Sequence, residues 1–278
     1  MDKLTEVTIG EIFNKELNDF AFRLAKDYSK SGSKYKNIEK KNNNFLISNL
    51  GEEVIVYSAL MRSLDSSLGN RIEQIALKVA VASGYKVSQG VSGNISSGTI
   101  NVIATLLDAY KDKSNPKKPL LSDLTLIQDS VKTTVGKSKF HNSDYLVEKT
   151  KNGKKTLTLL ELKIGGDLDN KKARSEKEAI LEQYAILVSE YEEEIEANKV
   201  EVKIYFATAY NKDSLNSGAK NWKQASVRSF FAEEELLIGK DFWNFICDSD
   251  KGWEVIMREY KKNSPIIKQT LSEVINSF

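Results

Sequence analysis

The chain has 278 residues and holds 41 lysines and arginines against 39 aspartates and glutamates, a formal net charge of +2. This near-neutral total lacks the basic excess that nucleic-acid-binding domains often show, but a whole-chain sum hides local charge. A single cysteine, Cys247, and a single histidine, His141, exclude an internal disulfide, a zinc cluster and a two-histidine zincin motif, so a catalytic metal would need oxygen ligands, which favours Mg²⁺ or Mn²⁺.

The N-terminal part of the chain has a helical pattern. Its first residues lack an apolar signal region, and nowhere is there an uncharged run of about 18 apolar residues, so we expect a cytoplasmic protein without a membrane partner. Apolar residues recur at helical spacing over 9–28, which predicts an amphipathic helix. The polar stretch 29–44 predicts an exposed loop, and a second helix is expected over 45–64.

The third predicted helix has the clearest ends. Asn70 is the expected N-cap, and Gly84 is the expected end of the helix. After it we expect a strand at 85–91, a loop rich in glycine and serine at 90–98, and a helix at 99–110. Gly93 and Gly98 in that loop have the spacing of a P-loop, but Thr99-Ile100 stands where lysine and serine or threonine are needed, so nucleotide binding is excluded.

The second half of the chain mixes strands with helices. A loop at 111–119 is followed by two strand candidates, 144–149 and 156–164, and by a long helix over 173–197. A strand at 200–210 comes next, and helical segments are expected near Phe242 and Val255. This order predicts an α/β (α+β) fold with a mixed central sheet and flanking helices.

The two strand candidates are separated by Asn152-Gly153, the strongest short signal for a two-residue type I′ hairpin. Such a turn places Asp144 directly opposite Glu161, with Cβ atoms about 4.5–5.5 Å apart. Because side chains alternate along a strand, Lys163 is expected on the same face as Glu161.

Two opposed carboxylates among leucines and valines repel each other, and burial adds to the penalty. A divalent cation between Asp144 and Glu161 would turn this repulsion into ligation, and Lys163 could contact a phosphate or position a water molecule. These groups are the equipment for metal-assisted phosphodiester hydrolysis. The competing interpretation is a solvated strand face that carries a structural ion pair.

Asp144 followed by Glu161-Leu162-Lys163 after a hairpin, with a helix before and a helix and strand after, resembles the PD-(D/E)XK nuclease superfamily. The resemblance implies a restriction-endonuclease-like core over 69–210, with helical additions at 1–68 and 211–278. It also implies that Asp144 and Glu161 bind Mg²⁺, for which Mn²⁺ can substitute, and that Lys163 assists the attacking water. Glu73, on the helix before the sheet, matches a glutamate that often supplies a further metal ligand or a neighbouring catalytic group. The competing interpretation is an exposed first-turn glutamate that the helix dipole favours. Ser143 stands where the proline of the motif's name would be.

The size and the extra helices are similar to those of type II restriction endonucleases. This resemblance implies cleavage of double-stranded DNA by a homodimer, pairing with a cognate DNA methyltransferase, and a prokaryotic cytoplasm. The run that begins at Glu161 is also similar to the TdeIII-like group, which is associated with GGNCC sites. Two alternatives stay open: another nuclease on the same core, such as a repair or structure-specific enzyme, and a DNA-binding or interaction protein without catalysis.

DNA contacts are expected in the loop and helix start that follow the second strand. Arginine and lysine can bind guanine edges or phosphates, and aspartate can accept a hydrogen bond from cytosine. Residues 111–177 hold 16 basic and nine acidic residues, so the neutral total conceals a local basic segment. The candidates are Lys137, Lys139, Asp169, Asn170, Lys171, Lys172 and Arg174. A solvated turn with a helix cap is the competing interpretation for the loop.

Overall fold

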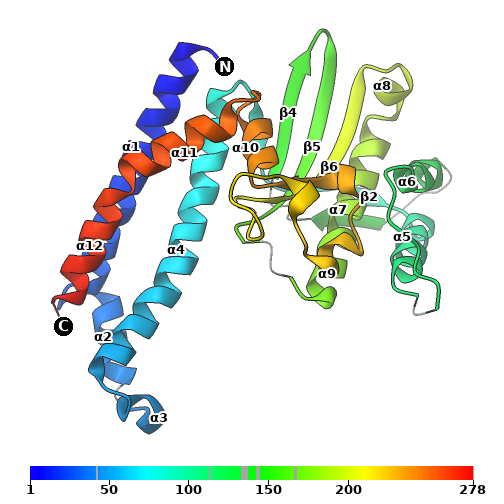
Figure 1. Cartoon of the computed structure of the whole chain (residues 1–278). Coiled ribbons are helices and arrows are strands. Elements are labelled where there is room, and N and C mark those ends of the chain that lie inside the picture. The colour runs from blue at the N-terminus through cyan, green and yellow to red at the C-terminus, as the bar shows by residue number, and fades with distance from the viewer. Residues whose placement is uncertain (42, 113, 133–136, 142–144, 166–167, 278) are drawn as a thin grey trace. The chain divides into compact units, whose positions relative to one another are not determined.

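The computed structural model describes residues 1–41, 43–112, 114–132, 137–141, 145–165 and 168–277, with only the backbone of 39, 52 and 137–141. The chain forms two compact units (Figure 1). Unit 1 comprises Met1–Ala82 and Asp248–Phe278, and unit 2 comprises Ser83–Cys247. Among the described residues, no helix combines the length and the apolar character that crossing a lipid bilayer requires.

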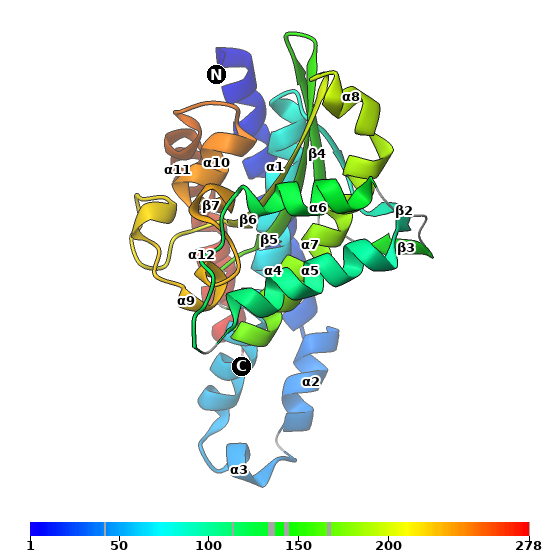
Figure 2. The same ribbon diagram turned by 90° about the vertical axis from the view of Figure 1, so that its right-hand side faces the viewer.

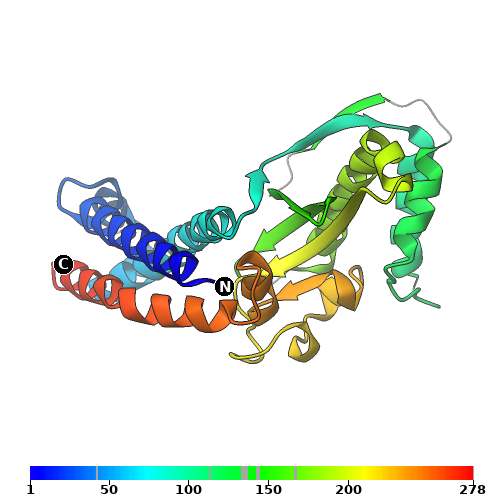
Figure 3. The ribbon, with the colours of Figure 1, turned by 90° about the horizontal axis from the view of Figure 1, so that it is seen from above.

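Unit 1 is built from helices packed around α1. Its elements are α1 (Lys3–Tyr28), α2 (Ser33–Lys41), α3 (Phe45–Ser48), α4 (Glu52–Ala82), α11 (Gly252–Asn263) and α12 (Pro265–Ile275). Figure 3 shows α1 between α4 on one side and α11 and α12 on the other, and α1 contacts all three. The predicted apolar stripe is the buried face of α1, with Ile9, Phe13 and Leu17 completely shielded from solvent. Asp2 caps this helix by accepting a hydrogen bond from the Thr5 amide at 2.8 Å.

Three expectations for unit 1 are wrong. The helix expected over 45–64 is divided, because α3 ends at Ser48 and α4 begins at Glu52. Residues 29–44 are not one loop, because α2 forms within them; its Ile38 is buried, and Lys34 pairs with Asp27 of α1 at 3.2 Å. Asn70 does not begin a helix, because α4 runs without a break through it. Apolar residues of α4 are buried on both sides of Asn70, so packing overrides the local capping signal. Gly84, with φ +86°, follows the end of α4 as predicted.

Unit 2 contains a mixed sheet. Within the described residues its strand order is β1-β4-β5-β6-β7, where β4 is antiparallel to β1 and β5, and β6 is parallel to β5 and β7. The bounds are β1 (Lys86–Ser88), β4 (Tyr145–Lys151), β5 (Lys154–Lys163), β6 (Val200–Thr208) and β7 (Leu236–Ile238). A separate antiparallel pair joins β2 (Val91–Ile95) to β3 (Lys137–His141). The predicted mixed α/β class is confirmed.

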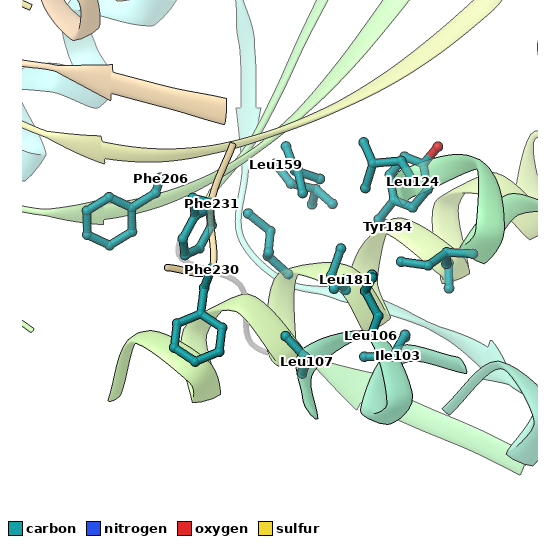
Figure 4. Close-up of a cluster of buried hydrophobic side chains, with 14 of the residues drawn as sticks. Ile103, Leu106, Leu107, Leu124, Leu159, Leu181, Tyr184, Phe206, Phe230 and Phe231 are labelled. Atoms are coloured by element: carbon teal, nitrogen blue, oxygen red, sulfur yellow. The ribbon is translucent and has the colours of Figure 1, made fainter. Parts of the chain in front are cut away.

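Helix α7 (Asn170–Glu190) lies at the centre of unit 2. It contacts β5 and β6 as well as β2, α5 (Ser97–Tyr110) and α6 (Asp123–Val131), so its residues 180–188 are all buried. Figure 2 shows α5 and α6 side by side in front of α7. Apolar side chains from the sheet, α5, α6, α7 and the segment around Phe230 form one core (Figure 4). On the other sheet face, Tyr205 contacts Phe245 of α10 (Lys240–Ile246), with ring centroids 5.7 Å apart.

The remaining elements of unit 2 are short: α8 (Glu192–Glu196), α9 (Ala225–Arg228), and the 3₁₀ turns η1 (Ala219–Asn221) and η2 (Glu233–Glu235). The long helix expected over 173–197 is interrupted at Tyr191, which separates α7 from α8. The predicted loop 90–98 contains β2. Gly93 in β2 packs so closely on α7 that a Cβ at this position would overlap with Cγ2 of Ile186.

The units divide the chain differently from the predicted ranges 1–68, 69–210 and 211–278. Residues 69–82 belong to unit 1 because they continue α4, and 248–278 join the same unit because α11 and α12 pack on α1. Residues 211–247 belong to unit 2, where β7 extends the sheet and α10 covers one face.

Candidate active site

The β4–β5 hairpin has the predicted turn and register. Asn152 and Gly153 have φ of 52° and 78°, as a type I′ turn requires. From the turn the pairing runs from Lys151 opposite Lys154 to Tyr145 opposite Leu160. Asp144 lies outside the described residues, so its position opposite Glu161 remains a prediction that extends this register by one residue.

Glu161 lies near the end of β5 and is 5% exposed. Its neighbour on β6 is the fully buried Phe206, and Leu159, two residues before it on the same face, belongs to the core. A carboxylate in such surroundings is costly to desolvate unless it is paired. The solvated-surface interpretation therefore does not apply to Glu161.

Lys163 lies on the same face as Glu161, as predicted, and its Nζ is 2.6 Å from Glu161 Oε1. The same ammonium is 3.4 Å from Oε1 of Glu176 on α7. The Lys163 side chain is 32% exposed, so its ammonium can meet both the buried carboxylate and a ligand that arrives from solvent.

Glu176 was not predicted from the sequence. Its contact with Lys163 depends on how α7 packs against the sheet. The spacing of residues along the hairpin says nothing about how α7 packs. The one sequence signal was position, because Glu176 lies in the first two turns of the helix that directly follows Lys163.

The loop after β5 enters α7 through a helix cap. Asp169 is the N-cap, and its Oδ1 accepts a hydrogen bond from the Lys172 amide at 2.8 Å. This hydrogen bond lowers the pKa of the Asp169 carboxyl below its ordinary value. The interpretation of this loop as a helix cap therefore applies to Asp169, whose carboxylate accepts the capping hydrogen bond of α7. Asn170 is the first residue of α7 and is exposed.

The other DNA-contact candidates differ in their surroundings. Lys171 and Lys172 are exposed on the first turn of α7, whereas Arg174 pairs with Asp108 of α5, with Nη2 and Oδ1 2.7 Å apart. Lys137 and Lys139 lie on β3, where their backbones pair with Ile95 and Gly93 of β2.

Glu73 belongs to unit 1, whereas all the other predicted site residues belong to unit 2. It is half-buried on α4, in the stretch where that helix runs toward Ala82. Its participation in catalysis remains a prediction.

A Mg²⁺ site would depend on the end of the hairpin. The described residues contain no cluster of three or more histidine, cysteine, aspartate or glutamate side chains suited to a metal. Asp144 lies outside the described residues, so it does not enter this search. Glu161 fits the requirement by its chemistry: it is a buried carboxylate that supplies the hard oxygens Mg²⁺ prefers. Glu161 and, by register, Asp144 are the residues that would hold the ion.

The model of the family described as "Type II restriction endonuclease, HinfI" matches residues 5–264. The chain belongs to this HinfI family. Membership makes it a type II restriction endonuclease, a site-specific nuclease whose substrate is DNA. No curated protein and no solved structure matches the chain. The expected restriction-endonuclease class is thereby confirmed, and the resemblance to the TdeIII-like group stays a prediction.

Proposed function

We propose that this HinfI-family chain is a Mg²⁺-dependent endonuclease that cuts double-stranded DNA at the hairpin site of Asp144, Glu161 and Lys163. The observation that carries the proposal is the buried Glu161 carboxylate held 2.6 Å from the Lys163 ammonium on a strand of confirmed register. A buried carboxylate and a partly exposed ammonium side by side at a strand end suit a site for a metal ion and a charged phosphodiester.

In the proposed mechanism, Asp144 and Glu161 would hold Mg²⁺, for which Mn²⁺ could substitute. The ion would supply positive charge at the scissile phosphate and make the attacking water more acidic. Lys163 donates hydrogen bonds from its ammonium to a phosphate oxygen or to the attacking water. The water oxygen bonds to phosphorus and gives up a proton to solvent, the P–O ester bond breaks, and the leaving oxygen takes up a proton from solvent. Glu73 is the candidate for a further acid in this reaction.

We place the DNA contacts on the basic start of α7 and on β3. Lys171 and Lys172 have exposed side chains that suit phosphate oxygens. Lys137 and Lys139 are proposed to serve the same purpose. Arg174 and Asn170 are candidates for base edges, while Asp169 acts by fixing the helix start through its cap.

Further proposals follow from the family. A homodimer would give two catalytic sites related by two-fold symmetry, one for each strand of a palindromic target. Host DNA would need protection by a cognate methyltransferase, and both enzymes would act in a prokaryotic cytoplasm. The GGNCC recognition sequence rests on the TdeIII-like resemblance alone.

Digestion of long phage DNA by the full chain with Mg²⁺ tests these proposals together. Discrete fragments whose sequenced ends share one short motif would support a restriction enzyme. A motif other than GGNCC would contradict only the proposed recognition sequence. Cutting that requires a flap or junction would favour a structure-specific nuclease. Duplex binding without any cleavage in Mg²⁺ or Mn²⁺ would favour the non-catalytic alternative.

A further inference from the structure

Among the described residues, the ammonium of Lys163 contacts two carboxylates that differ in their surroundings. Glu161 Oε1 is 2.6 Å away on a side chain that is 7% exposed. Glu176 Oε1 is 3.4 Å away on a side chain that is 27% exposed. The shorter contact is therefore to the acid proposed as a metal ligand, and the longer one is to an acid to which no role has been assigned.

Glu176 occupies a firmly held part of α7. The helix start is fixed by the Asp169 cap, and the next residue, Lys177, is buried and paired with Glu235 at 2.6 Å. Ala173, one turn before Glu176, is also fully buried against the core. The backbone that carries Glu176 is therefore anchored on both sides of it, so the carboxylate stays within reach of Lys163.

The pairing of Lys163 with Glu161 conflicts with metal binding. A divalent cation on Glu161 would need the carboxylate oxygens that the Lys163 ammonium contacts. The cation and the ammonium, bound to the same carboxylate, would also repel each other strongly in a partly buried site. The ammonium must therefore move away from Glu161, or it lowers the affinity of Glu161 for the metal ion. Glu176 offers the ammonium another negative partner without a long displacement, because Glu176 Oε1 is already 3.4 Å from Lys163 Nζ.

We propose that Glu176 is a positioning residue for Lys163: it receives the ammonium when a metal ion takes Glu161 and keeps it beside the scissile phosphate. This inference rests on the proposed function. Glu176 acts only through Lys163 and needs no contact with DNA or metal. Without it, the ammonium stays on Glu161 and competes with the ion.

Calcium binding to the full chain, measured by titration calorimetry without DNA, tests the competition directly. Glu176→Gln should weaken calcium binding about tenfold or more, the usual effect of losing a residue that orients a metal site. Glu178→Gln is the matched control, because Glu178 lies two residues along α7 and makes no ion pair among the described residues. In a Lys163→Met background, Glu176→Gln should have no further effect.

Cleavage kinetics give a second reading. Glu176→Gln should lower kcat about tenfold or more and leave KM for DNA unchanged, and Glu176→Asp should restore part of the rate. Wild-type calcium affinity and kcat in Glu176→Gln would overturn the inference, as would an equal loss of calcium affinity in the Lys163→Met background. If the wild-type chain neither binds calcium nor cleaves DNA, the proposed function fails instead. Metal-free thermal unfolding of each variant establishes that it folds.

Discussion

The Lys177 ammonium and the Glu235 carboxylate are 2.6 Å apart, and each side chain is only 2% exposed. Burial lowers the pKa of Lys177 and the charge of Glu235 opposes this effect, so each ion depends on the other. The ammonium also lies 4.7 Å from the Phe231 ring centre, and Glu235 accepts a hydrogen bond from the Ala232 amide. This pair ties α7 to the segment before β7.

Breaking this pair should destabilise unit 2. Either Lys177→Met or Glu235→Gln should lower the free energy of unfolding by about 3–5 kcal/mol, because each leaves one charge or polar group buried without its partner. The double variant should lose less than the sum of the two single losses. Urea unfolding of the four proteins measures the coupling. Additive losses would mean that the two side chains do not depend on each other.

The contact between β2 and α7 should not tolerate a side chain at position 93. Gly93→Ala should lower the free energy of unfolding by about 1–3 kcal/mol, because its Cβ would overlap with Ile186 and force a shift. Shortening the opposing side chain with Ile186→Ala should make Gly93→Ala less damaging. Ser92→Ala, on the exposed neighbouring position, is the control. Thermal unfolding compares the variants, and equal melting temperatures for wild type and Gly93→Ala would contradict the packing.

Unit 1 should lose stability in acid through Glu16. Burial disfavours its charged form, but hydrogen bonds from Lys78 and Arg71 outweigh burial and lower the pKa of Glu16 below its ordinary value of 4.5. The interactions of the charged Glu16 with Lys78 and Arg71 therefore stabilise the fold fully above pH 4.5. This stabilisation is lost as the pH falls through the lowered pKa of Glu16. Glu16→Gln should cost about 3 kcal/mol at pH 7 and progressively less below pH 4.5.

Chemical denaturation across pH 3 to pH 7 measures that difference, with Glu11→Gln as an exposed control on the same helix. A penalty for Glu16→Gln that stays constant over this range would contradict the ionic role of Glu16.

Lys171 and Lys172 should contribute to DNA affinity through phosphates. Each change to alanine should weaken duplex binding for all sequences and reduce the slope of log affinity against log salt by about 0.9. Lys268→Ala, an exposed lysine of unit 1, should leave the slope unchanged. Fluorescence anisotropy of labelled duplex DNA, with Ca²⁺ in place of Mg²⁺ and over a series of salt concentrations, measures the affinity and its salt slope. Unchanged slopes for both variants would remove the start of α7 from the DNA surface.

The hairpin could be predicted from the sequence because its geometry is local. Asn152-Gly153 sets the turn, the turn sets the register, and strand alternation places Lys163 with Glu161. The helix α1 was predictable for the same reason, since its buried face follows the spacing of its apolar residues.

What the sequence did not reveal depends on long-range packing. β2 and β7 are short strands whose neighbours are distant in sequence, and Gly93 looked like a loop residue because nothing local indicates Ile186 beside it. The continuation of α4 through Asn70 reflects packing on α1, which a capping signal cannot anticipate. Glu176 was missed because its approach to Lys163 is set by the fold of α7 over the sheet.

The most direct test of the catalytic assignment is plasmid cleavage by Glu161→Gln in Mg²⁺. This change keeps the shape of the side chain and removes the charge that would hold the metal and pair with Lys163. We predict that cleavage falls at least about a hundredfold, while duplex binding and metal-free folding persist. Wild-type cleavage by Glu161→Gln, at the same sites and rate, would contradict an active site at the end of the β4–β5 hairpin.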